Sequence, residues 1–207
     1  MCGRYYVGSE EDQQEIREIL TELNRRYHDR PVLGKLASGE IFPTQNAPVI
    51  VHDPEQQELR AAIMSWGFPV PGSKRQSIIN ARCETAASKP MFKKAVEQGR
   101  LIVPATSYFE WQKNTDGSKT KQRISPANGE LLRMAGLWRV FTDQSGERLI
   151  SFVIITRPAS AELAYIHDRM PLVLNSEESA AWLEHVDIAR QFLAMPPEPD
   201  LAAIAVI

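Results

Sequence analysis

The second half of the chain consists of short apolar runs separated by turn sequences, and this pattern restricts the fold more than any other feature. Four of the runs have the length and composition of β-strands: Leu101–Pro104, Tyr108–Gln112, Leu131–Phe141 and Arg148–Thr156. Helical segments fall between strands without the regular strand–helix alternation that a parallel sheet requires. The sequence therefore predicts an α+β fold, one domain over residues 1–207, with a mostly antiparallel, barrel-like sheet and flanking short helices.

The remaining elements follow from local signals. Apolar residues at helical spacing behind the cap Ser9 predict a helix over 10–27, and Gly99 ends a predicted helix over 85–98. Asn175 and Glu178 form a capping box that opens a helix to His185. Further predictions are short helices at 159–166 and 187–194, paired strands at 47–52 and 59–66, strands at 170–174 and 201–207, and loops at 31–44 and 68–72.

Composition excludes several classes of protein. Hydrophobic residues make up 43% and charged residues 24% of the chain, which is typical of a globular protein rather than a disordered or fibrous one. Two cysteines give no disulfide framework, and no apolar run approaches the ~18 residues of a membrane span. We expect a soluble cytoplasmic protein that does not bind membranes. The net charge of −2 argues against a general duplex-DNA binder but is compatible with a local anion site.

The chain opens with Met1-Cys2-Gly3-Arg4. A small second residue generally allows removal of the initiator methionine, which would leave Cys2 at the N-terminus. The pKa of an α-amine is about 7.7–8.0, so roughly 10–20% of the amine is neutral at pH 7 and can attack a carbonyl. The neighbouring thiol could close on the resulting imine to form a thiazolidine, because such ring closures have effective molarities of up to ~10⁵–10⁸ M. An alternative use of the same residue is that of an N-terminal nucleophile hydrolase.

Four further motifs lie at the ends of predicted elements. Each one alone also fits a purely structural role, as a cap, an ion pair, a junction histidine or a core tryptophan. The motifs are Asn80-Ala81-Arg82-Cys83-Glu84-Thr85, Phe109-Glu110-Trp111, His167-Asp168-Arg169-Met170-Pro171 and Ser65-Trp66-Gly67.

Together with Cys2-Gly3-Arg4, these motifs resemble the SOS-response-associated peptidase family, the abasic-site-processing (SRAP) domain. The resemblance runs from Cys2 to about Leu174, in the family's order and approximate spacing. The segment Ile41–Pro48 matches the family's loop only loosely, and the chain stops at Ile207, where members often carry a short tail.

The resemblance implies a covalent mechanism on single-stranded DNA that contains an abasic site. Cys2 would form an imine and then a thiazolidine with the C1′ aldehyde of the ring-opened sugar, which protects the lesion in the DNA damage response. Glu110 would be the acid/base, and His167 would assist ring opening and crosslink reversal. Asn80 would hold the sugar or the terminal amine. Abasic-site lyase activity and release of Met1, by self-processing or ordinary methionine removal, are corollaries.

The resemblance also implies which residues bind the DNA. Arg4, Arg82 and Arg169 would contact phosphates, Trp66 would stack on a base, and Pro48 would wedge beside it. We expect a monomer without a small-molecule cofactor that becomes nucleoid-associated on DNA. No metal is expected, since two distant cysteines and four scattered histidines lack ligand spacing: His28, His52, His167 and His185.

Two alternatives stay open at this point. One is an N-terminal-cysteine peptidase or amidohydrolase, and the other is a non-covalent reader of single-stranded or modified DNA in which Cys2 is incidental. One basic cluster is interpreted as a solvated hairpin tip rather than a binding site: Lys113, Lys119, Lys121 and Arg123.

Overall fold

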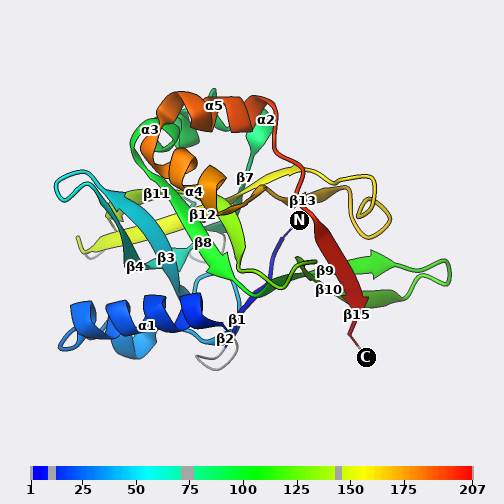
Figure 1. Ribbon diagram of the computed structural model, residues 1–207, viewed down its shortest axis with the longest axis horizontal. Helices are drawn as coiled ribbons and strands as arrows, with labels where there is room; N and C mark the ends of the chain where they lie inside the picture. Colours follow the sequence, from blue (N-terminus) through cyan, green and yellow to red (C-terminus); the bar gives the residue numbers. More distant parts are fainter. Residues whose placement is uncertain (1, 9–12, 71–76, 143–145, 207) are drawn as a thin grey trace.

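The computed structural model describes residues 2–8, 13–70, 77–142 and 146–206. Its strands form two large sheets and a two-stranded ribbon, with helices at opposite ends of the molecule (Figure 1). The predicted cap Ser9 lies outside the described residues. Within the described ranges, none of the helices combines the length and the apolar character that crossing a bilayer requires.

The larger sheet contains a closed five-stranded barrel, as the sequence predicts. Strand β12 closes it, because β12 pairs with β11 on one side and with β4 on the other. All neighbours in the barrel are antiparallel except β12 and β4. The barrel strands, in spatial order, are β4 (Glu58–Trp66), β3 (Asn46–Asp53), β8 (Arg100–Ala105), β11 (Leu132–Thr142) and β12 (Arg148–Pro158).

The second sheet has five strands and carries the N-terminus of the described chain. Strand β1 lies between β9 and β2 and therefore has a hydrogen-bonded neighbour on each side. In spatial order the strands are β15 (Leu201–Ala205), β10 (Lys119–Pro126), β9 (Ser107–Lys113), β1 (Tyr5–Val7) and β2 (Gly39–Ile41). Short strands complete the structure: β5 (Phe68–Pro69), β6 (Ser77–Ile78), β7 (Asn80–Arg82), β13 (Arg169–Pro171) and β14 (Val173–Leu174).

Six strands lie where the sequence predicts none: β1, β2, β5, β6, β7 and β10. β10 lies in the segment interpreted as a hairpin tip, and β2 lies in the predicted loop 31–44. In β10 the residues Gln122 and Ile124 are buried while Arg123 is exposed, so burial alternates from one residue to the next as in a strand. The segment contains no apolar run that would indicate this strand from the sequence. Pairing with β9 and β15 supplies the stability that its composition does not indicate.

The helices form two groups, with α1 (Gln14–Tyr27) at one end of the barrel and α2 to α5 at the other (Figure 1). The capping box of Asn175 and Glu178 is confirmed at the start of α4 (Ser176–Glu184), which α5 (Val186–Ala194) follows. The predicted helix 85–98 is instead α2 (Cys83–Ala86) and α3 (Pro90–Gln98), because Pro90 keeps Lys89 extended. A 3₁₀ turn (Leu33–Lys35) follows α1.

The predicted helix 159–166 is wrong. The segment forms successive turns, in which the backbone N–H groups of Leu163 and Ala164 both donate to the carbonyl of Ser160. This irregular loop leads from β12 to His167, so the histidine lies at a turn-to-strand junction.

One half-buried arginine joins the helical end to the barrel. The guanidinium of Arg100, at the start of β8, donates to four backbone carbonyls at the ends of α3 and α4: those of Val96 (2.9 Å), Glu97 (2.8 Å), Trp182 (2.6 Å) and Leu183 (2.8 Å). The last carbonyls of a helix have no partner within the helix, so Arg100 satisfies the ends of two helices at once.

Candidate active site around Cys2

Strand β1 fixes the position of the candidate nucleophile. Tyr5 pairs with Tyr108 of β9, and the backbone N–H of Phe109 donates to the carbonyl of Arg4 at 2.9 Å. Cys2 comes directly before this strand and is fully buried, with 0% of its surface exposed. The residue predicted to react is therefore held by the core rather than placed on a mobile end.

Asn80 lies against the backbone of Cys2. Strand β7 runs parallel to β12, with Asn80 opposite Ile154, and the side-chain Nδ2 of Asn80 donates to the carbonyl of Cys2 at 3.0 Å. Its Oδ1 atom is buried and accepts no hydrogen bond from any residue that the structure describes. A buried acceptor of this kind costs free energy, so it suits a site in which a ligand supplies the donor.

Glu110 is the charged group that acts most strongly on the thiol of Cys2. It lies on β9 and is buried, with 5% of its surface exposed. Burial raises the pKa of the Cys2 thiol far above its usual range, and the negative charge of Glu110 raises it further. The thiol donates weakly to the carbonyl of Arg4, at 3.9 Å. At neutral pH Cys2 therefore carries a thiol and not a thiolate.

Two tyrosines that the sequence analysis missed also lie beside the thiol. Burial raises the pKa of Tyr5 and of Tyr108, and the neighbouring Cys2 raises both further. The hydroxyl of Tyr5 is buried without a hydrogen-bond partner among the described residues. Strand alternation could have indicated Tyr108, because it lies two positions before Glu110 and so shares its face of the sheet.

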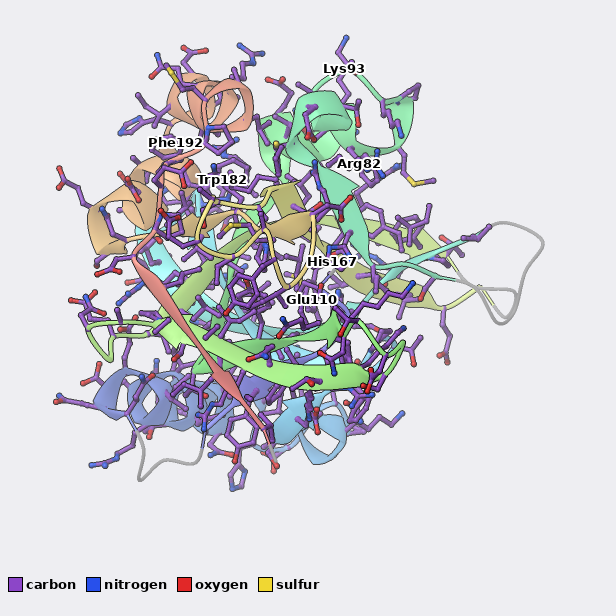
Figure 2. All side chains as sticks on the ribbon, turned by 90° about the vertical axis from the view of Figure 1, so that its right-hand side faces the viewer. Arg82, Lys93, Glu110, His167, Trp182 and Phe192 are labelled. Carbon is purple, nitrogen blue, oxygen red and sulfur yellow. The ribbon has the colours of Figure 1, made fainter. Side chains whose placement is uncertain are left out.

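In the view of Figure 2 the label of His167 lies just above that of Glu110, with Arg82 further up. The side chain of His167 is 32% exposed. Nδ1 accepts a hydrogen bond from the backbone N–H of Arg169 at 3.0 Å and lies 2.8 Å from the carboxylate of Asp168. The bond from Arg169 places the proton of the neutral ring on Nε2, and the carboxylate provides a counter-ion when Nδ1 is protonated.

The three arginines predicted to bind phosphate differ in their availability. Arg82 is exposed and forms no ion pair with any residue in the described ranges. Arg4 is paired with Glu40 at 3.3 Å. Arg169 is paired through both terminal nitrogens with Glu84, and it donates to the carbonyl of Thr156 at 2.7 Å. A phosphate could bind Arg82 directly, whereas it would have to displace a carboxylate from the other two.

Two residues predicted to contact DNA are buried in this structure. Trp66 is fully buried, so its ring offers no face to a base. It packs against Tyr5 and Phe152, and its Nε1 donates to the carbonyl of Ile79 at 3.0 Å, which supports the segment that carries Asn80. Pro48 is buried within β3 opposite Ile63 and cannot act as a wedge. Both residues are buried because β3 and β4 are barrel strands with a paired strand on each side.

The pair between Glu84 and Arg169 gives a test by acid. The Arg169 guanidinium lowers the pKa of Glu84 to about 2, so the carboxylate stabilises the folded state above its ordinary pKa of 4.5. This stabilisation is lost as the pH falls from about 4.5 to about 2. We expect Glu84→Gln to reduce the free energy of unfolding by about 1 kcal/mol at pH 7, a value discounted because the side chain is 45% exposed.

The difference between the variant and the wild type should shrink as the pH falls below 4.5, as measured by urea unfolding at several pH values. Glu58→Gln is the matched control, because Glu58 is exposed and forms no ion pair within the described part of the chain. An equal loss for Glu84→Gln at pH 7 and at pH 2.5 would contradict the assignment.

Comparison with known proteins agrees with the motifs. The family model described as "SOS response associated peptidase (SRAP)" matches residues 1–206. The abasic site processing protein YoqW of Bacillus subtilis is 34% identical over 191 residues, which cover 88% of this chain and 80% of that protein. The abasic site processing protein YedK of Escherichia coli is 30% identical over 186 residues, which cover 88% of this chain and 79% of that protein.

Solved structures show the same fold. A protein of Bacteroides thetaiotaomicron has a TM-score of 0.76 at 23% identity, over 100% of this chain and 92% of that one. A protein of Bordetella bronchiseptica has a TM-score of 0.75 at 24% identity, over the whole of both chains. With a family model that spans nearly every residue and relatives at 30% identity or more, this chain belongs to the SOS response associated peptidase (SRAP) family.

Proposed function

We propose that this protein captures abasic sites in single-stranded DNA by forming a covalent crosslink through Cys2. The observation that carries the proposal is the buried grouping of Cys2 with Asn80 and Glu110, in which the Asn80 amide bonds to the Cys2 carbonyl and Glu110 acts on the thiol. Curated relatives that cover most of the chain bear names of abasic site processing proteins, which supports the substrate class.

The reaction begins at the α-amine of Cys2 once Met1 is removed. The neutral amine adds to the C1′ aldehyde of the ring-opened sugar, and loss of one water gives the imine. The S–H group then adds across the C=N bond, so that sulfur bonds to C1′ and the proton moves to nitrogen. The product is a thiazolidine, formed with the net loss of one water. A protonated thiol suits this order, because the amine attacks first and the thiol closes the ring.

The surrounding residues take separate roles in this scheme. Glu110 accepts the proton of the amine and returns one to the departing water, a transfer that a positioned carboxylate accelerates by about 10²–10⁴-fold. His167 opens the sugar ring and assists reversal, because an imidazole can both donate and accept a proton. The free Oδ1 of Asn80 accepts a hydrogen bond from the sugar. Arg82 is the first phosphate contact, and Arg4 and Arg169 are the others.

The protonated thiol also distinguishes this function from an N-terminal-cysteine peptidase. A cysteine that attacks a peptide carbonyl acts as a thiolate, and reactive cysteines have a lowered pKa. Burial and Glu110 shift the pKa of Cys2 in the opposite direction. Capture of an aldehyde by the amine therefore fits the site better than hydrolysis of an amide.

The test is the intact mass of the purified protein, alone and after incubation with single-stranded DNA that contains one abasic site. The protein alone should have lost Met1, and the adduct should weigh the sum of protein and DNA less one water. The adduct should also give a heat-stable shifted band on a denaturing gel. Absence of the adduct after Met1 removal, or an equal yield with intact DNA, would refute the proposal.

Replacement of the two proton-transfer residues should affect opposite directions of the reaction. Glu110→Gln is expected to slow crosslink formation by about 10²-fold without abolishing it, because the amide keeps the shape and loses the base. His167→Ala should slow formation only modestly, because the sugar ring also opens without a catalyst, and should mainly slow reversal. Time courses of formation and of release to a competitor oligonucleotide measure both rates. Identical time courses for the variants and the wild type would reject these roles.

A further inference from the structure

The outer face of the five-stranded sheet carries a row of cations on aromatic rings. Side chains alternate along β1, β9 and β10, so that Tyr5, Tyr108 and Ile124 enter the core while their neighbours lie on the other face of the sheet, where Phe109 is itself buried. We call the set on that other face the outer strip, and it consists of Arg4, Tyr6, Phe109, Lys121 and Arg123.

Each cation of the outer strip lies over a ring. The guanidinium of Arg4 is 4.8 Å from the ring of Trp111, and Lys121 Nζ is 4.0 Å from the ring of Phe109. The guanidinium of Arg123 is 5.8 Å from the ring of Tyr6. Cations held over rings in this way keep a fixed position while their charge stays accessible.

A single carboxylate joins two of these cations. Oε1 of Glu40, on β2, lies 2.7 Å from Lys121 Nζ and 3.3 Å from a terminal nitrogen of Arg4. The three side chains are between 25% and 30% exposed. Ion pairs this accessible contribute little to stability, so another anion can replace the carboxylate at small cost. A phosphate can accept hydrogen bonds from the same two cations through its own charged oxygens.

A groove continues from this ion pair along the sheet. It has a volume of about 820 Å³ and is lined by Tyr6, Phe109, Lys121 and Arg123, with Ile204 and Val206 of the C-terminal segment along one side. Arg123 donates to the hydroxyl of Ser107 at 3.1 Å and forms no ion pair within the described ranges. Lys121 and Arg123 are two positions apart on β10, about 7 Å along the strand. The groove therefore combines aromatic side chains with two positive charges and one carboxylate, that of Glu130.

We infer that the outer strip binds the sugar–phosphate backbone of single-stranded DNA next to the site, and that Glu40 occupies the place of a phosphate until DNA displaces it. The inference rests on the proposed function, because Arg4 is two residues from Cys2 and so connects the strip to the reacting end. Bases stacked on rings beside lysine and arginine are typical of binding to single strands without sequence preference. An acidic peptide matches the charge but has no bases for the rings.

The inference makes Glu40 a residue that weakens binding. We expect Glu40→Gln to tighten the binding of single-stranded DNA by about threefold to tenfold, because two cations lose their resident anion. Lys121→Gln should weaken binding by a similar factor and reduce the slope of log Kd against log salt by about 0.7. The gain from Glu40→Gln should shrink in the double variant, because the two residues share one ion pair.

The measurement is fluorescence anisotropy of a labelled oligothymidine without an abasic site, in the Cys2→Ala background, between 50 and 200 mM salt. Glu58→Gln and Lys93→Gln are the matched controls, because both residues are exposed and lie off the outer strip. A duplex of equal length should bind less tightly than the single strand, since its bases are not available to the rings.

Unchanged or weaker binding by Glu40→Gln would overturn the inference. So would a preference for the duplex, or tighter binding of an oligoglutamate peptide than of the oligothymidine. Crosslinking by the Cys2 protein is scored separately, on abasic DNA. If crosslinking succeeds and the strip variants bind as the wild type does, only the outer strip is refuted. If crosslinking fails, the proposed function is refuted whatever the strip variants do.

Discussion

Cys2→Ala is expected to abolish the heat-stable crosslink to abasic single-stranded DNA, lowering its yield by at least about 100-fold. The variant keeps a terminal amine after Met1 removal, so it can still form the imine. It has no thiol to close the ring, and ring closure has the large intramolecular advantage in this reaction. Water then returns the imine to amine and aldehyde during denaturation.

This difference allows the amine and the thiol to be tested separately. Borohydride reduces an imine to a stable amine, so it should restore a heat-stable band for Cys2→Ala. The matched control is Cys83→Ala, which removes the only other cysteine, a buried residue beside Glu84. It should crosslink as the wild type does. An undiminished band for Cys2→Ala without borohydride, or a lost band for Cys83→Ala in a folded protein, would contradict the assignment.

Arg100→Met is expected to cause the largest loss of stability, about 3–4 kcal/mol. The substitution leaves four helix-terminal carbonyls without their charged donor, and such hydrogen bonds contribute about 1.5–3 kcal/mol each before relaxation and water recover part of the loss. For a chain of this length the loss corresponds to a fall in Tm of about 10 °C.

Thermal and urea unfolding measure this effect, with Arg82→Met as the control. Arg82 is an exposed arginine without an ion pair to any described residue, so its replacement should change stability by less than about 0.5 kcal/mol. A similar small effect for Arg100→Met would mean that water satisfies the carbonyls equally well. The effect should appear first as loosening of α3 and α4, because the guanidinium of Arg100 bonds to the last turns of both.

The elements predicted correctly are those whose signals are local. The hairpin of β3 and β4 follows from two apolar runs around a turn, and the start of α4 follows from Asn175 and Glu178 alone. β10 could not be predicted in this way, because a strand of mainly polar residues is stabilised by its neighbours β9 and β15. Tertiary pairing overrides weak local preference in such cases.

The same distinction applies to the candidate site. Motif order predicted that Cys2, Asn80 and Glu110 act together, and the structure places Asn80 on the Cys2 backbone with Glu110 acting on its thiol. The burial of Trp66 could not be predicted, since an aromatic residue at a strand end fits both a core and a surface. The pairing of Arg169 with Glu84 joins two segments 85 residues apart, which no local pattern indicates.

The position of β1 between β2 and β9 determines when the reactive end can assemble. Tyr5 pairs with Tyr108, so the partner strand leaves the ribosome only after ~100 further residues have been made. At about 5–20 residues per second, the first residues wait roughly 5–20 s before their binding groove exists. During that interval a methionine aminopeptidase can reach Met1, whereas afterwards Cys2 is enclosed. Late β-sheet pairing thus gives the nascent chain a window for maturation.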